Sequence, residues 1–225
     1  MSGDYKNQPS LGFSTASINH IQHGRADADF GAEVIGANLG LYSITFNNDA
    51  ELDREALIDY RDFRVDAELL GFRHFLEVFA PNAPVQPIED IPRFVNDAIA
   101  RCLAGVPKAS RPLFLKMPYF GPAAMEQLVH YDPTLIVGIL GGSAGTTHDA
   151  FRMLWEAKKY GARAALFGRK INNAEDQLTF VRFLRALADG QIEPDEAVRA
   201  YHGELQKADI KPNRPLQDDL QLTQF

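Results

Sequence analysis

The chain has 225 residues, of which 45% are hydrophobic and 24% are charged, proportions that are typical of a globular protein and exclude a disordered or fibrous one. Thirty acidic residues outnumber 23 basic ones and give a net charge of -7, which disfavours binding to nucleic acid. The longest apolar run, 135–140, is too short to cross a membrane. Cys102 is the only cysteine, which excludes internal disulfides and multi-cysteine metal sites. We therefore expect a soluble, cytoplasmic protein without a membrane partner.

Short apolar segments alternate with amphipathic stretches from residue 32 onward. The apolar segments predict strands at 33–38, 73–79, 113–117, 134–140 and 162–167. The amphipathic stretches predict helices at 49–70, 88–103, 122–130, 148–160, 174–188 and 194–207. Because near-continuous apolar strands are joined by helices, the pattern predicts a parallel sheet of the α/β class, either doubly wound or part of a (β/α)8 barrel of the TIM type.

The segment after the fourth predicted strand is rich in glycine and leads directly into a helix. Glycines let the backbone approach a ligand closely, and the N–H groups at a helix start favour an anion. In this interpretation Gly141, Gly142 and Ser143 hold a phosphate. The alternative is a tight turn in which Thr146 or Thr147 caps the helix. The segment alone leaves both interpretations open.

The loop after the fifth predicted strand supplies positive charge. In (β/α)8 barrels, phosphate is frequently held jointly by the loops after the last two strands. We therefore expect Gly168 and Arg169 to complete an anion site with the glycine-rich segment. The alternative is that Arg169 and Lys170 are ordinary solvated surface cations.

A lysine stands at the end of the third predicted strand. Burial of Lys116 would lower the pKa of its amine and leave part of it neutral, as attack on a carbonyl and Schiff-base formation require. The alternative is a lysine whose charged end extends from the strand into water.

Three motifs together resemble the class I aldolases of the archaeal type and their deoxyribose-phosphate and tagatose-bisphosphate relatives. These motifs are 116–121, 138–146 and 165–170, and the resemblance covers roughly residues 110–190. It implies a (β/α)8 barrel in which Lys116 is the Schiff-base lysine and the substrate is a small phosphorylated sugar or ketone. It also implies a set of phosphate-binding residues: Gly142, Ser143, Gly168 and Arg169. No metal or organic cofactor is required.

The strand before Lys116 departs from the family pattern. Where those aldolases carry a tryptophan and, two residues later, a tyrosine that handles the proton, this chain has Glu77 and Phe79. Phe79 has no exchangeable proton, so the role passes to Glu77, to Tyr119 or to a water that they position. Glu77 is also placed to form an ion pair with Lys116, which would hold the lysine charged.

Chain length is the second departure. If 162–167 corresponds to strand eight, then 33–38 corresponds to strand four, and residues 1–31 are too few for three further βα units of about 30 residues each. We therefore predict an irregular segment at 1–31, a partial barrel at 32–207 that lacks the first three units, and a polar surface tail at 208–225. An open sheet edge needs a cover, so we expect a homo-oligomer that associates near 33–38.

The residues favour one function over two alternatives. The favoured hypothesis is a class I aldolase-like lyase in which Lys116, Glu77 and Tyr119 are catalytic. The first alternative is a non-catalytic protein that binds phosphosugars or serves in assembly, and the second is an acyl transferase that uses Lys116 on a phosphorylated dione. His20 and His23 have a spacing seen in metal sites, but no third ligand follows, so we expect no metal.

Overall fold

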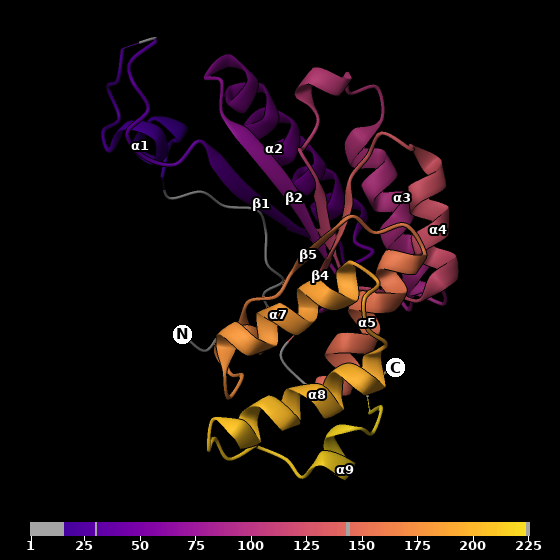
Figure 1. Ribbon diagram of the computed structural model, residues 1–225. Helices are drawn as coiled ribbons and strands as arrows, with labels where there is room; N and C mark the ends of the chain where they lie inside the picture. Colours follow the sequence, from indigo (N-terminus) through magenta and orange to yellow (C-terminus); the bar gives the residue numbers. More distant parts are fainter. Residues whose placement is uncertain (1–15, 30, 143–144, 224–225) are drawn as a thin grey trace. The chain divides into compact units, whose positions relative to one another are not determined.

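The computed structural model describes residues 16–29, 31–142 and 145–223 (Figure 1). These residues form an α/β fold with parallel strands and flanking helices, as the alternating pattern predicted. The chain divides into two compact units. Unit 1 comprises Met1–Met117 and Thr134–Ile136, and unit 2 comprises Pro118–Pro133 and Val137–Phe225. None of the described helices is both long enough and apolar enough to span a membrane.

Unit 1 contains three strands that pair in parallel in the order β1-β2-β3. Their bounds are Leu39–Thr45 for β1, Arg73–Phe79 for β2 and Leu115–Met117 for β3. In register, β1 runs alongside the whole of β2, and Glu77 of β2 pairs with Lys116 of β3. Since successive side chains point to opposite faces of a sheet, this register decides which polar groups share a face.

Helices cover one face of the unit 1 sheet and bury its apolar side chains. The helices of this unit are α1 (Ile18–His23), α2 (Ala50–Leu69) and α3 (Ile91–Leu103), with a short 3-10 turn, η1, at Lys108–Ser110. Figure 1 shows α2 beside the strands, and both α2 and α3 contact β2. Leu76 and Val78 of β2 are buried on this face. The periodicity of α3 explains its place, because its buried residues fall on one side of the helix.

The strand predicted at 33–38 was wrong, and the first strand is β1. The backbone N–H groups of Ile35 and Gly36 donate to the carbonyl of Gln22 instead of to a strand, and the Ile35 side chain is 77% exposed. Gly36 and the alanine after it are weak strand formers, whereas Leu39–Thr45 alternates and includes β-branched and aromatic residues. The expected association edge near 33–38 is therefore not a strand edge.

Unit 2 contains two parallel strands and six helices among its described residues. The strands are β4 (Val137–Leu140) and β5 (Ala164–Leu166), and the helices are α4 (Pro122–Tyr131), α5 (Thr147–Lys159), α6 (Arg169–Asn172), α7 (Gln177–Ala188), α8 (Pro194–Lys207) and α9 (Leu216–Asp219). The polar tail predicted at 208–225 thus contains α9, and the side chain of Asp219 in it is buried.

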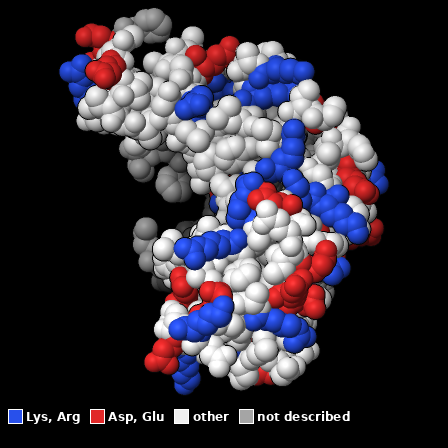
Figure 2. Space-filling view, viewed as in Figure 1, with Lys and Arg blue, Asp and Glu red and all other residues white. Residues whose placement is uncertain are grey.

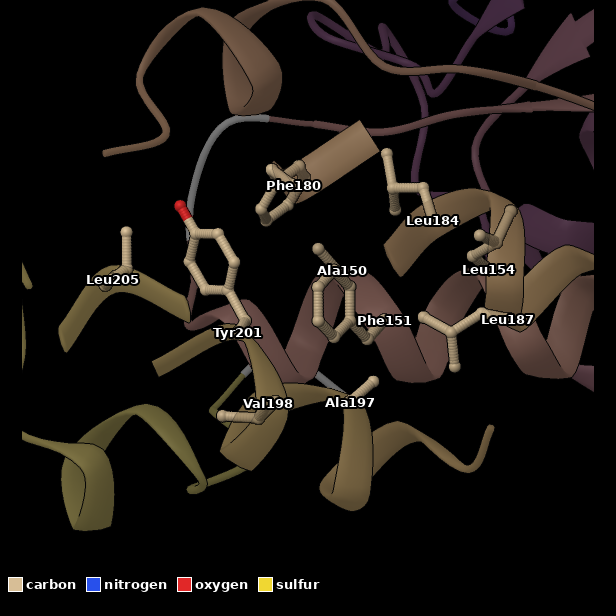
Figure 3. Packing of buried hydrophobic residues seen from close by; sticks show 10 residues of the cluster. All are labelled: Ala150, Phe151, Leu154, Phe180, Leu184, Leu187, Ala197, Val198, Tyr201 and Leu205. Atoms are coloured by element: carbon tan, nitrogen blue, oxygen red, sulfur yellow. The ribbon is translucent and has the colours of Figure 1, made fainter. Parts of the chain in front are cut away.

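Aromatic side chains from α5, α7 and α8 form the centre of the unit 2 core (Figure 3). The rings of Phe151 and Phe180 lie 5.1 Å apart, and Tyr201 meets Phe180 edge-on at 5.6 Å. Figure 3 shows the Tyr201 hydroxyl at the rim of this cluster, where it donates to Glu175. The apolar faces of these three helices therefore pack together and hold α5 in place.

Candidate functional site

A serine, a glutamate and a lysine form one row across the three strands of unit 1. Ser43 pairs in register with Glu77, and Glu77 pairs with Lys116. Lys116 Nζ lies 2.6 Å from Glu77 Oε1, and Ser43 Oγ donates to Glu77 Oε2 at 3.2 Å. The side chain of Glu77 is 4% exposed and that of Lys116 is 20% exposed. Each oxygen of the carboxylate therefore has a partner, and the lysine is the more accessible member of the pair.

The ion pair that the sequence suggested between Glu77 and Lys116 is thus present. A carboxylate 2.6 Å from an ammonium holds the lysine in one position, and it is also a proton acceptor within direct reach. Sequence analysis missed Ser43 because it placed the first strand six residues too early. With β1 in its correct place, the two-residue alternation would have brought Ser43 into the same row.

The row lies in the carboxyl-terminal half of the strands. Glu77 is followed by only two further residues of β2, and Lys116 is followed by one residue of β3. The side chain of Phe79, which stands where the related aldolases have a tyrosine, is 40% exposed at the end of β2. In parallel α/β folds, ligands bind at the carboxyl ends of the strands. The position of the row therefore suits a ligand site.

In unit 2, Tyr119 and two of the predicted glycines line one cavity of about 360 Å3. Gly141 and Gly142 form part of its wall, and the remaining wall is largely apolar. The Tyr119 hydroxyl donates to Glu156 Oε2 at 3.1 Å. Burial, and then the nearby Glu156 carboxylate, raise the pKa of Tyr119 well above its ordinary value. Tyr119 therefore remains protonated and acts as a hydrogen-bond donor.

The loops after β4 and β5 lie side by side, as expected for a shared anion site. Gly141 N donates to the carbonyl of Leu166, and a side chain at Gly141 would collide with the ring of Phe167. Lys170 Nζ donates to the carbonyl of Gly145 at 3.0 Å, and burial lowers the pKa of Lys170. Lys170 therefore brings a cation to Gly145, at the described end of the glycine-rich segment.

Three of the predicted phosphate-binding residues are not found in the wall of the cavity beside Tyr119: two lie at the surface, and the third is outside the described residues. Gly168 and Arg169 are exposed, and neither is among the described residues that line the cavity beside Tyr119. Ser143 lies outside the described residues. The structure thus brings Gly141 and Gly142 together with Tyr119 and leaves Arg169 at the surface.

The start of α5 is occupied by the protein's own carboxylates. Thr146 caps the helix, as the second interpretation of the segment predicted: its Oγ1 accepts from Asp149 N, and its N–H donates to Asp149 Oδ2. Thr147 N, the next N–H, donates to Asp219 Oδ1 at 2.7 Å. Two carboxylates therefore lie where an incoming anion would meet the positive end of the helix.

Residues of the C-terminal segment hold this helix start in several ways. Asp219 Oδ2 lies 3.0 Å from His202 Nε2. Burial raises the pKa of Asp219, but the hydrogen bonds from Thr147 and His202 outweigh it, so this pKa is lowered overall. Thr223 donates through its N–H and its hydroxyl to Asp149 at 2.8 and 2.6 Å. Sequence analysis missed these contacts because no local pattern marks them.

Comparisons with known proteins show a likeness of fold. No family model and no curated protein matches the chain. Among solved structures, the chain is similar to the crystal structure of Cgl0159 from Corynebacterium glutamicum (Brevibacterium flavum), with a TM-score of 0.50 and 19% identity. The match covers 69% of this chain and 52% of that one, so the chain spans about half the length of that protein. Within the described residues, no three His, Cys, Asp or Glu side chains gather as metal ligands would.

Proposed function

We propose that this protein is a class I aldolase-like lyase of the (β/α)8 type, which uses Lys116 to form an imine with a phosphorylated keto compound. The observation that carries the proposal is the ion pair of 2.6 Å between Lys116 and a nearly buried Glu77. Its place near the carboxyl ends of parallel strands supports a catalytic role. The helices that join successive parallel strands support the barrel part of the proposal.

The pair supplies what imine formation needs. Glu77 Oε1 accepts a proton from Lys116 Nζ, and the neutral amine attacks the carbonyl carbon of the substrate. The carbinolamine then loses its hydroxyl as water, which takes up the proton held by Glu77, and an iminium remains. Ser43, by donating to the second oxygen of Glu77, keeps the first oxygen directed at the lysine.

Cleavage follows from the positive charge of the iminium. Glu77, again a carboxylate, accepts the proton of the hydroxyl on the carbon that leaves as an aldehyde. The electron pair of the broken carbon–carbon bond moves into the enamine, which regains that proton at carbon. Hydrolysis of the resulting iminium frees the ketone and restores Lys116. Each proton thus passes between the substrate and one carboxylate.

We place the phosphate of the substrate at the loops after β4 and β5. The adjacency of these loops and the cation that Lys170 brings to them support this placement. The proposed binding residues are those of the aldolase resemblance: Gly141, Gly142, Ser143, Gly168 and Arg169.

Trapping the imine tests the proposal. The full chain is incubated with dihydroxyacetone phosphate and sodium borohydride, and peptide mass spectrometry should locate the reduced adduct on Lys116. Lys116→Met should abolish it, whereas Lys108→Met, which removes an exposed lysine of unit 1, should leave it unchanged. Glu77→Gln removes the proton acceptor and should slow trapping by about 100-fold or more. Binding of the ketone without an adduct, or an adduct that persists in Lys116→Met, would contradict the proposal.

A further inference from the structure

Three arginines line a small cavity in unit 1, at the amino-terminal end of the strands. The cavity has a volume of about 80 Å3 and is bordered by Arg64 of α2, Arg73 at the start of β2 and Arg111 in the segment before β3. Arg73 is the first residue of β2, whereas Glu77 lies near its other end. The cavity therefore shares no residue with the proposed catalytic row.

Positive charge is in excess in this cavity. Among the described residues, no carboxylate lies within ion-pair distance of Arg64 or Arg73. Glu68 is the one carboxylate among the lining residues, and it accepts a hydrogen bond from Ser110 Oγ at 2.5 Å. Arg64 and Arg73 therefore bring two positive charges to the cavity, against the single carboxylate of Glu68.

This excess contrasts with the rest of the protein. The chain as a whole carries a net charge of -7, and the face in Figure 2 shows basic and acidic side chains intermixed. Burial, and then the charge of Arg64, lower the pKa of His74, which also lines the cavity, to about 4. The histidine is therefore neutral near pH 7 and does not change the net charge of the groups that line the cavity.

Two of the guanidinium groups are held by the backbone. Arg73 Nε donates to the carbonyl of Asn38 at 3.3 Å, and Arg111 Nε donates to the carbonyl of Val106 at 3.0 Å. A guanidinium has five N–H donors in a rigid fork, so an anchored Nε leaves the geometry of the remaining donors fixed. Like charges gathered in this way repel one another, and a bound anion would offset that repulsion.

We propose that this cavity binds a dianionic oxyanion of the phosphate class. Its volume of about 80 Å3 is room enough for one tetrahedral oxyanion. Arginine forks match the paired oxygens of such a group. The ligand is inorganic phosphate or the phosphate of a monoester whose remainder projects past the exposed Arg73.

Calorimetric titration of the full chain with inorganic phosphate, at pH 7.5 and constant ionic strength, tests the proposal. Arg64→Gln and Arg73→Gln should each weaken phosphate binding at this site about tenfold or more, because each removes a charge-assisted contact. Arg61→Gln is the matched control: it removes the same charge from α2, but Arg61 is exposed and pairs with Asp62. Its phosphate affinity should remain within about twofold of the unaltered chain. A parallel titration with glycerol 2-phosphate shows whether the site also takes a monoester.

The outcomes separate this site from the proposed phosphate loops of unit 2. Equal phosphate affinity in the unaltered chain, Arg64→Gln and Arg73→Gln would overturn the inference. Phosphate binding that disappears in Arg169→Ala but persists in Arg64→Gln and Arg73→Gln would also overturn it. Loss of binding in Arg64→Gln and Arg73→Gln, with unchanged circular dichroism and melting temperature in chloride, supports it. If no imine is trapped on Lys116, the catalytic proposal is wrong, but phosphate binding at the arginine cavity is unaffected.

Discussion

The Lys116–Glu77 pair should make substitutions of its two members strongly non-additive in their effect on stability. Removing one partner of a buried ion pair typically costs ~3–5 kcal/mol. Lys116→Met leaves the Glu77 carboxylate, which is 4% exposed, with the Ser43 hydroxyl as its side-chain partner among the described residues, and should cost ~3 kcal/mol. Glu77→Gln should cost less, ~1–2 kcal/mol, because Lys116 reaches solvent and the amide oxygen still accepts a hydrogen bond.

The double variant removes both charges and should cost little more than Glu77→Gln alone. A double-mutant cycle should therefore give a coupling free energy of ~2–3 kcal/mol. Urea unfolding followed by far-ultraviolet circular dichroism measures the four free energies. The fluorescence of Trp155, the single tryptophan, reports unit 2 separately, and its transition serves as an internal control. A coupling free energy below ~0.5 kcal/mol would refute a close ion pair in solution.

Two further substitutions test unit 2. Asp219→Asn should destabilise it by ~1–2 kcal/mol, because Thr147 N and His202 lose a charged acceptor. Since the folded-state pKa of Asp219 is lowered, its contribution is present above about pH 4 and is lost as the pH falls further. The difference in melting temperature between the unaltered chain and Asp219→Asn should therefore narrow from pH 6 to pH 3, and a constant difference would contradict this reasoning. Gly141→Ala forces a methyl group against Phe167 and should cost ~1–3 kcal/mol in thermal unfolding; an unchanged melting temperature would disprove the close approach.

Local sequence patterns located most of the elements. The strand predicted at 73–79 matches β2 at both ends, and the helix predicted at 49–70 exceeds α2 by one residue at each end. Both have unambiguous periodicity. The pattern failed at 33–38 because a short apolar pair beside a glycine resembles a buried strand, whereas the true β1 leaves Leu39 and Leu41 partly exposed and looks less apolar.

Contacts within the candidate site were predictable only where they join paired positions of neighbouring strands. Glu77 and Lys116 fall in this class, and their pairing was anticipated. The contact of Asp219 with Thr147 spans 72 residues and leaves no local trace in the sequence. The choice between Arg169 and Lys170 depended on the short helix α6, in which adjacent side chains point about 100° apart, so only one of them faces the glycine-rich segment.

The contacts between the start of α5 and the C-terminal segment also determine when unit 2 can finish folding during synthesis. Asp149 is joined to Thr223, which follows it by 74 residues. At ~5–20 residues per second, a ribosome needs roughly 4–15 s to make that stretch. Throughout this interval, water must take the place of Thr223 on the Asp149 carboxylate. Unit 2 therefore acquires its final hydrogen bonds only after residue 223 has left the ribosome, well after the Lys116–Glu77 row of unit 1 has emerged.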